Sequence, residues 1–267
     1  MGVVCRWLAY SGPPIRLAEV VYSPVHSLID QSLHSRLGEE TTNGDGFGVG
    51  WYGAAGEAPG VFHSVEPAWN DRNLRELSTH ITSGHFFAHI RAATGTAVQK
   101  TNCHPFRHGR WLWMHNGVIG DFARLKRELV LAVDPSLFSS IEGQTDSEVL
   151  FFLALTFGLE DDPVGAVERA AGFVEEVGAR HGVQHPIQMT VGTTDGERIW
   201  AFRYSSEGRS RSLFTSGERR GDETRLVVSE PLGLPGEWSE VGEATCVVVR
   251  PGEDEVRDFT PRAPVSG

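Results

Sequence analysis

The chain has 267 residues, of which 40% are hydrophobic, so it can bury an ordinary core in one large domain or two small ones. Its formal net charge of -11 disfavours a polyanionic partner, because phosphate binding needs clustered Lys and Arg, and we expect no nucleic-acid partner. No apolar run approaches the roughly 18 residues that a membrane helix needs, so we also expect no membrane partner.

The three cysteines, Cys5, Cys103 and Cys246, are too few and too scattered for a disulfide framework or a zinc ribbon. Their odd number would leave a free thiol in an oxidising compartment. The N-terminus carries no basic segment followed by an apolar stretch of signal-peptide length. We therefore expect a cytoplasmic protein.

The first half of the chain predicts strands. Residues 4–10 alternate in polarity and end at a Ser-Gly-Pro-Pro turn. Residues 44–53 alternate glycine with larger apolar side chains, which is typical of a strand whose glycines let other backbone approach closely. Residues 85–94 and 110–117 are apolar and aromatic runs that end in polar groups, which again favours strands.

Three helices are predicted next, over residues 121–133, 145–158 and 162–182. The first has apolar residues at helical spacing. The second begins with Thr145 three residues before Glu148, a capping-box pattern, and is apolar on nearly all sides, which predicts deep burial. The third has Asp162 as a candidate N-cap and Pro163 at the first helical position.

The last part of the chain predicts short strands separated by turns from Pro186 onward, and a flexible tail from about 253 to 267. No linker divides the chain, so we expect a single domain over residues 1–267. Strands, then helices, then strands, without a regular βαβ alternation, predict a mixed α+β layered domain.

Cys5 stands at the start of the first predicted strand. A cysteine in such a place is most often a small core residue. At the end of a chain, however, its own α-amine titrates near neutrality while its thiol titrates at about 8.5. Such a residue can attack an amide carbonyl, form a thioester and release an amine without a separate histidine.

Several motifs follow one another in a specific order: CRWLAYSG (5–12), DGFGVGW (45–51), AHIRAATG (88–95), TNCHPF (101–106), MHNGVIGDF (114–122), TDSE (145–148) and SEPLG (229–233). Together they resemble the class II glutamine amidotransferases, most closely the stand-alone members, over nearly all of the chain. The resemblance implies the N-terminal nucleophile (Ntn) hydrolase fold, a four-layer α-β-β-α sandwich. It also implies hydrolysis of glutamine to glutamate and ammonia, with Cys5 as the catalytic nucleophile.

The resemblance also implies substrate-binding residues. Arg91 matches the arginine that grips the glutamine α-carboxylate, for which a planar fork of donors is suited. Thr94 and Gly95 match the turn that lines the glutamine site, and Asp146 matches the acid that pairs with the α-ammonium. Taken alone, Arg91 also fits a surface salt bridge, and Asp146 fits an acid favoured by the dipole of a helix N-terminus.

Asn116 and Gly117 match the catalytic oxyanion pair of the family, one side-chain N–H and one backbone N–H directed at the developing negative oxygen. By itself, Asn-Gly more often marks a hairpin turn. Here Val118 and Ile119 follow, and then a predicted helix, which disfavours the hairpin interpretation.

The histidines invite a metal interpretation, because zinc prefers imidazole ligands and His85 and His89 are four residues apart. In the predicted strand these two would lie about 13 Å apart, at roughly 3.3 Å per residue, which is too far for joint ligation. We therefore expect no metal, and the function implied by the resemblance needs no cofactor. The NCHPF segment, which contains His104, resembles a family segment near the active site. We expect His104 to support the site structurally rather than to act as an acid or base.

Residues 1–4 separate Cys5 from the start of the sequence. While Gly2 to Val4 remain attached, the nitrogen of Cys5 is an amide and cannot act as a base. Two hypotheses stay open: Val4 is the true initiator, translated as methionine and removed, or a very short propeptide is cut off. In both, residues 1–4 are absent from the mature chain.

The leading functional hypothesis is cleavage of the γ-amide of glutamine through a Cys5 thioester, with the ammonia passing to a separate acceptor enzyme. A second hypothesis keeps the chemistry but replaces glutamine by another γ-glutamyl conjugate, as in related hydrolases of ergothioneine biosynthesis. A third is a non-catalytic protein that binds glutamine or a partner protein, if Cys5 is not N-terminal.

Overall fold

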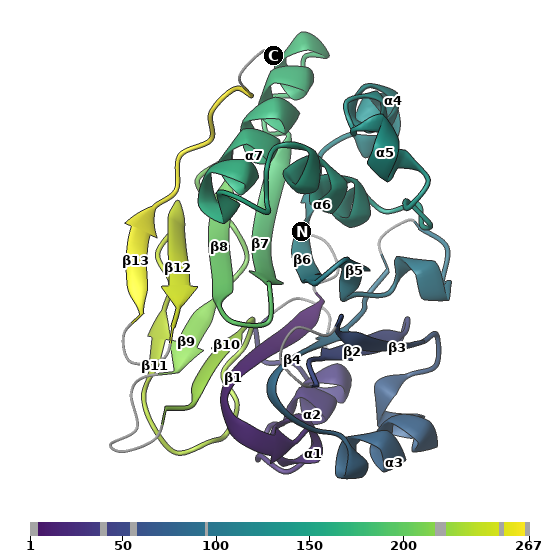
Figure 1. Cartoon of the computed structure of the whole chain (residues 1–267), viewed down its shortest axis with the longest axis vertical. Helices are drawn as coiled ribbons and strands as arrows, with labels where there is room; N and C mark the ends of the chain where they lie inside the picture. The colour runs from purple at the N-terminus through teal and green to yellow at the C-terminus, as the bar shows by residue number, and fades with distance from the viewer. Residues whose placement is uncertain are drawn as a thin grey trace.

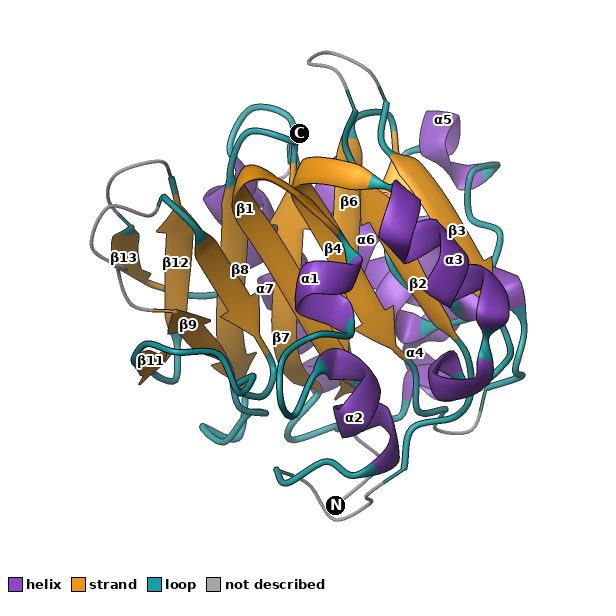
Figure 2. Ribbon diagram, turned by 90° about the horizontal axis from the view of Figure 1, so that it is seen from below, coloured by secondary structure: helices purple, strands orange, loops and turns teal. Residues whose placement is uncertain are grey.

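A computed structural model describes residues 5–37, 42–53, 58–93, 96–216, 223–250 and 254–264. Within these residues the chain forms two antiparallel sheets that pack face to face, with helices on their outer sides (Figures 1 and 2).

The first sheet has the strand order β11-β9-β10-β1-β4-β2-β3. Its strands are β1 (Arg6–Arg16), β2 (Phe47–Trp51), β3 (Gly60–Ser64), β4 (Thr82–Ile90), β9 (Phe214–Ser216), β10 (Arg225–Val228) and β11 (Trp238–Glu240). Strand β1 lies in the middle, paired with β4 on one side and β10 on the other. Cys5 therefore lies at the end of a central strand.

The second sheet has the order β13-β12-β8-β7-β6-β5. Its strands are β5 (Phe106–His108), β6 (Trp111–Ile119), β7 (Ile187–Thr194), β8 (Ile199–Ser205), β12 (Thr245–Val249) and β13 (Glu255–Asp258). The strand regions expected from the sequence are found in both sheets, but the expected end of the first strand at Ser11–Pro14 is wrong. Strand β1 continues through these residues to Arg16, with an irregularity in its pairing with β4 between Ser11 and Ile15.

Successive side chains of β1 point to opposite faces of the sheet and contribute to two layers of the core. Trp7 and Ala9 belong to the cluster between the two sheets, whereas Leu8 and Tyr10 belong to the cluster on the outer face. Three helices cover that outer face, as Figure 2 shows: α1 (Ala18–Val21), α2 (Leu28–Leu33) and α3 (Arg72–His80).

The outer face of the second sheet is covered by the helices of the middle of the chain (Figure 1). These are α4 (Phe122–Leu131), α5 (Pro135–Phe138), α6 (Asp146–Thr156) and α7 (Pro163–Arg180), and two 3-10 turns, η1 (Ala68–Asn70) and η2 (Lys100–Asn102), lie in connections. The expected four-layer α-β-β-α sandwich is thus confirmed.

Helix α6 is buried as its composition predicts, but its N-terminus differs from the expected capping box. The Thr145 side chain accepts a hydrogen bond from the Glu148 backbone N–H, which is half of the box. The Glu148 carboxylate instead accepts hydrogen bonds from the backbone N–H groups of Glu142 (2.9 Å) and Gly143 (2.8 Å). It therefore fixes the loop before the helix.

The C-terminal segment differs from the expected flexible tail over its described part. Residues Glu255–Asp258 form β13 at the edge of the second sheet, paired with β12. Phe259 is 2% exposed and packs against Phe202, and Arg262 pairs with the buried Glu168. An aromatic anchor and an ion pair, neither of them visible in the local composition, hold this segment.

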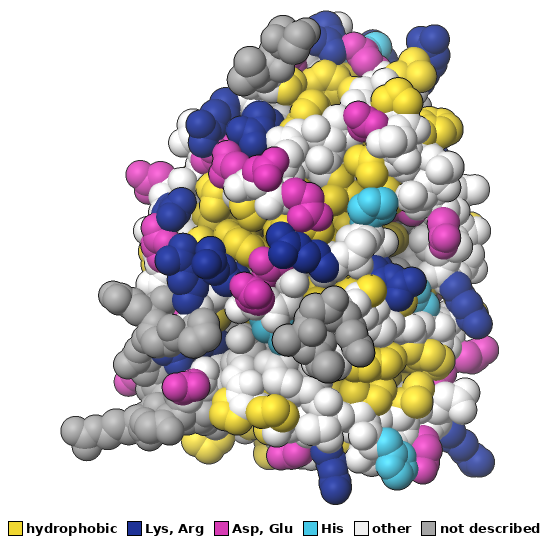
Figure 3. All heavy atoms as spheres, viewed as in Figure 1, with side chains coloured by type: hydrophobic (Ala, Val, Ile, Leu, Met, Phe, Trp, Pro, Cys, Tyr) yellow, Lys and Arg dark blue, Asp and Glu magenta, His cyan; other side chains and the backbone are white. Residues whose placement is uncertain are grey.

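The surface carries both signs of charge. On the face drawn in Figure 3, Lys and Arg side chains are interspersed with Asp and Glu. Ion pairs such as Arg180 with Glu128 and Arg203 with Glu240 join elements across the surface. No helix among the described residues is both long enough and apolar enough to cross a bilayer.

Buried histidines make the fold sensitive to mild acid. Burial lowers the pKa of His85 to about 4 and that of His89 to about 3, so both are neutral in the folded chain at pH 5. In the unfolded chain they titrate near 6.5, so below that pH the unfolded state binds more protons. We expect each to lower the free energy of unfolding by about 2 kcal/mol between pH 6.5 and 5.

Urea unfolding at pH 7 and pH 5 measures this loss. His85→Gln should reduce the difference between the two pH values, whereas His80→Gln, at an exposed position, should leave it unchanged. Equal stability of the original chain at pH 7 and pH 5 would contradict the prediction.

Candidate active site

Cys5 lies directly before β1, in contact with the backbone that follows β4. Its Sγ accepts a hydrogen bond from the Ala92 N–H at 3.4 Å and lies 3.6 Å from the Ala92 carbonyl oxygen, to which it donates. Burial raises the pKa of the Cys5 thiol above its ordinary value, although the Ala92 N–H and the charges of Arg91, Arg6 and Arg211 oppose this. The thiol therefore needs a base to become a nucleophile.

A cavity of about 270 Å³ opens beside Cys5. Arg91, Asn116, Gly117 and Asp146 line it together with Cys5. The fold thus brings together five residues that the motifs single out between positions 5 and 146 of the chain. Thr94 and Gly95 lie outside the described residues, as do residues 1–4; the flanking Ala93 and Thr96 line the same cavity.

Arg91 follows β4 and is 4% exposed. Its guanidinium donates to Thr96 Oγ1 at 2.7 Å and to the Asp45 carbonyl oxygen at 3.4 Å. Among the described residues it forms no ion pair, so the surface salt-bridge interpretation is wrong for this part of the chain. A buried cation in a cavity wall without a carboxylate partner is suited to bind an anionic group of a ligand.

Asn116 and Gly117 lie inside strand β6, opposite Thr190 and Met189 of β7, so the hairpin interpretation is wrong. The Asn116 Nδ2 donates a hydrogen bond to the Cys5 carbonyl oxygen at 3.0 Å. A Cβ on Gly117 would lie 1.9 Å from the Gln188 carbonyl oxygen, so only glycine fits. One amide hydrogen of Asn116 is thus committed to Cys5, and the side chain carries a second one.

Asp146 is the first residue of α6 and serves two purposes there. Its carboxylate accepts hydrogen bonds from the Ile119 N–H and the Ser147 N–H, each at 2.8 Å. These contacts join the helix N-terminus to the end of β6, in agreement with the helix-dipole interpretation. The same residue lines the cavity, so a cation bound there would meet its negative charge.

Two imidazoles form one wall of the cavity; sequence reasoning expected His104 near the site as scaffold but missed His115. His104 and His115 both line it, and His115 Nδ1 lies 2.8 Å from Ser147 Oγ. Burial lowers the pKa of both imidazoles, so this wall is uncharged at neutral pH. Both stand in quoted motifs, TNCHPF and MHNGVIGDF, which is the signal that could have identified them.

His85 and His89 point to different partners rather than to a shared ligand. His85 Nε2 lies 2.6 Å from Thr194 Oγ1, and the His89 ring lies 4.2 Å from that of His104, between centroids. Among the residues that the structure describes, no group of three or more His, Cys, Asp and Glu side chains is arranged to hold a metal ion.

Comparisons with known proteins show the family of the chain. The family model of class II glutamine amidotransferases matches residues 18–206, a span that begins after Cys5. The chain is 32% identical to the probable glutamine amidotransferase DUG3 of Saccharomyces cerevisiae, over 92% of this chain and 82% of that protein. It is 27% identical to the gamma-glutamyl-hercynylcysteine sulfoxide hydrolase of Mycolicibacterium smegmatis, over 92% and 96% of the two chains.

Among solved structures, the chain is similar to a glutamine aminotransferase class-II domain protein from Silicibacter pomeroyi. The two are 34% identical and superimpose with a TM-score of 0.78, covering 97% of this chain and 100% of the other. The similarity therefore extends over the whole layered domain and is not limited to the site.

Proposed function

The chain belongs to the class II glutamine amidotransferases, and from that premise we propose that it hydrolyses a γ-glutamyl amide through a thioester on Cys5. One observation carries the proposal. A partly exposed cysteine, a buried arginine with no ion-pair partner among the described residues, and an aspartate line the same cavity of about 270 Å³. Such a cavity can hold an α-amino acid by both of its charged ends.

The two ends of the substrate are held by opposite charges. The α-carboxylate binds the Arg91 guanidinium, and the α-ammonium binds the Asp146 carboxylate. The γ-carbonyl carbon then lies next to Cys5 Sγ. A second hydrogen of the Asn116 amide and the Gly117 backbone N–H stabilise the oxyanion that forms when sulfur attacks.

The α-amine of Cys5 carries the protons in this proposal. Because burial raises the pKa of the thiol, a base is required, and an α-amine with a pKa near 8 is suited to this step. It takes the thiol proton as the S–C bond forms, then gives it to the leaving amine as the C–N bond breaks. Water then attacks the thioester, and the acid product and the thiol are released.

The leaving group separates two versions of this function. With glutamine the product is ammonia, which we propose passes to a separate acceptor enzyme. With a larger γ-glutamyl conjugate the leaving amine is an organic molecule, a version favoured by the similarity to the M. smegmatis hydrolase over most of both chains. The recognition of the glutamyl end is the same in both.

The decisive experiment compares two forms of the protein. One starts at Cys5, produced from a coding sequence in which methionine directly precedes it, and the other retains residues 1–4. Intact mass verifies each terminus, and a panel of γ-glutamyl amides that includes glutamine is assayed. We expect turnover only in the form that starts at Cys5, because the attached residues convert its amine to an amide.

Equal turnover by the two forms would contradict the role of the α-amine. Binding of glutamine without turnover by either form would overturn the enzymatic function and leave the non-catalytic hypothesis.

A further inference from the structure

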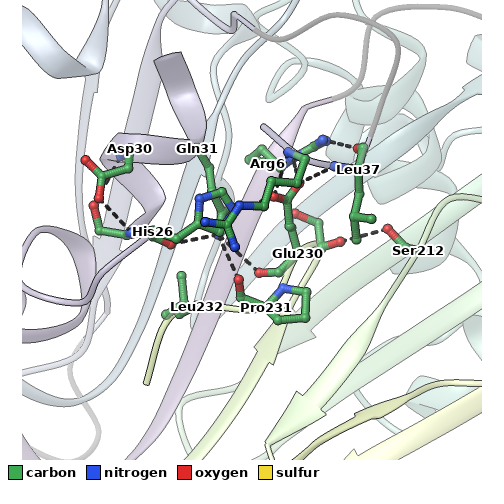
Figure 4. Close-up of polar contacts among 12 residues, drawn as sticks. Arg6, His26, Asp30, Gln31, Leu37, Ser212, Glu230, Pro231 and Leu232 are labelled. Atoms are coloured by element: carbon green, nitrogen blue, oxygen red, sulfur yellow. Dashed lines mark hydrogen bonds and ion pairs between the residues drawn. The ribbon is translucent and has the colours of Figure 1, made fainter. Parts of the chain in front are cut away.

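A buried carboxylate that does not line the cavity joins three segments of the chain next to Cys5. Glu230, just after β10, is 2% exposed. Figure 4 shows it among Arg6, His26 and Leu37. Its Oε1 lies 2.5 Å from His26 Nε2 and accepts from the Arg36 N–H at 2.9 Å. Its Oε2 accepts from Arg6 Nε at 3.0 Å and from the Leu37 N–H at 3.0 Å.

Arg6 connects this carboxylate to the nucleophile. The side chain is 1% exposed, and its guanidinium donates from Nε to Glu230, from Nη2 to the Leu37 carbonyl oxygen, and from Nη1 to the Cys5 carbonyl oxygen at 3.0 Å. The Cys5 carbonyl also accepts from Asn116 Nδ2. The planar fork of one arginine therefore spans Glu230, the Leu37 backbone and Cys5.

Cys5 depends on these contacts because the pairing of strand β1 starts only at the next residue, Arg6. The register of β1 with β4 begins at Arg6 opposite Ile90, so Cys5 has no partner in the sheet ladder. Residues at the end of a chain lose order unless something holds them. Among the described residues, Cys5 is held by the contacts of its Sγ with Ala92 and by two hydrogen bonds to its carbonyl oxygen.

We propose that Glu230 is a positioning residue, which orients Arg6 so that the Cys5 carbonyl, and with it the sulfur and the α-amine, stays fixed beside the Asn116 amide. The inference deepens the proposed function and rests on it. Glu230 touches neither Arg91 nor Asp146, so its effect falls on the reaction and not on the binding of the glutamyl end.

The charge state of Glu230 agrees with this role. Burial alone would raise its pKa, but the Arg36 N–H, the Arg6 charge, His26 and the Leu37 N–H together hold the pKa below its ordinary value. The carboxylate is therefore ionised at neutral pH and can hold the guanidinium in one orientation. A glutamine at this position would turn an N–H₂ group toward donors.

Glu230→Gln, made in the form that starts at Cys5, tests the proposal. We expect kcat to fall by about 10²-fold, the size of loss that a displacement of about 1 Å of a catalytic group causes, with KM nearly unchanged. Arg6→Lys keeps the positive charge but removes the planar guanidinium with its several donors. It should likewise lower kcat and leave KM nearly unchanged.

Glu168→Gln is the matched control. Glu168 is also buried and pairs with an arginine, Arg262, but the pair lies on α7 and the C-terminal segment rather than beside Cys5. This variant should lose stability without the selective loss of kcat. Equal kcat in wild type and Glu230→Gln would overturn the proposal.

A second measurement separates this inference from the proposed function. Alkylation by iodoacetamide, followed by peptide mass, reports the freedom of each cysteine whether or not the protein turns over γ-glutamyl amides. In Glu230→Gln, Cys5 should be alkylated several-fold faster, while labelling by 6-diazo-5-oxo-norleucine, a glutamine-like electrophile, should slow.

Cys103 and Cys246, both 0% exposed, are internal references, because global unfolding would expose them as well. Faster alkylation of Cys5 with unchanged Cys103 and Cys246 supports positioning. Unchanged alkylation of Cys5, or equal acceleration of all three cysteines, contradicts it. If wild type lacks turnover, the proposed function fails, and the alkylation result alone judges the role of Glu230.

Discussion

Replacing Cys5 by alanine in the form that starts at residue 5 should abolish turnover of γ-glutamyl amides, with kcat falling by about 10⁶-fold, as for removal of a covalent nucleophile elsewhere. The proposed oxyanion donors and the proposed binding residues stay in place, but no thioester can form. Substrate binding should survive, because Arg91 and Asp146 are unchanged. Steady-state assays and a thermal shift with glutamine measure the two effects.

Cys246→Ala is the control for this prediction. Cys246 lies in β12, is fully buried, and does not line the cavity. Its removal should lower stability and leave kcat intact. Turnover by Cys5→Ala at more than a trace level would mean that another group attacks the amide, and the thioester mechanism would have to be abandoned.

Replacing Asn116 by alanine should lower kcat by about 10²–10³-fold, the loss seen when one oxyanion donor is removed. The effect should reach or exceed the upper end of that range, because Asn116 also donates to the Cys5 carbonyl oxygen. KM should change little, since the residues proposed to bind the α-carboxylate and the α-ammonium are untouched. Pre-steady-state kinetics should place the loss in formation of the acyl-enzyme.

Asn70→Ala supplies the comparison, because Asn70 is exposed in η1 and does not line the cavity. It should retain full activity. A rise in KM with unchanged kcat for Asn116→Ala would assign this amide to substrate binding and remove it from the oxyanion role.

The layered architecture follows from patterns that are local in the sequence. Alternation in β1 assigns Trp7 and Leu8 to opposite faces, and the all-round apolar character of residues 145–158 corresponds to the buried α6. Prediction from local composition was wrong for the C-terminal segment, because the residue that anchors it lies far away in the sequence. The segment around β13 is polar, and it is held by Phe259 against Phe202.

The motifs identified five of the residues that line the cavity, because their order along the chain is specific although each motif is weak alone. The exposure and partners of those residues needed the structure. From the sequence alone, Arg91 also fits a surface salt bridge and Asp146 also fits an acid at a helix N-terminus. Only the surroundings distinguish them: Arg91 is buried without an ion pair among the described residues, whereas Asp146 binds the Ile119 N–H and also faces the cavity.

The fold class, the family and five of the residues that line the cavity could be inferred from the sequence, because periodicity and short motifs depend on neighbouring positions. The tertiary structure alone decided how Cys5 is held. Glu230 meets Arg6 from 224 residues away, and that meeting depends on β10 pairing with β1, a register that no local pattern encodes.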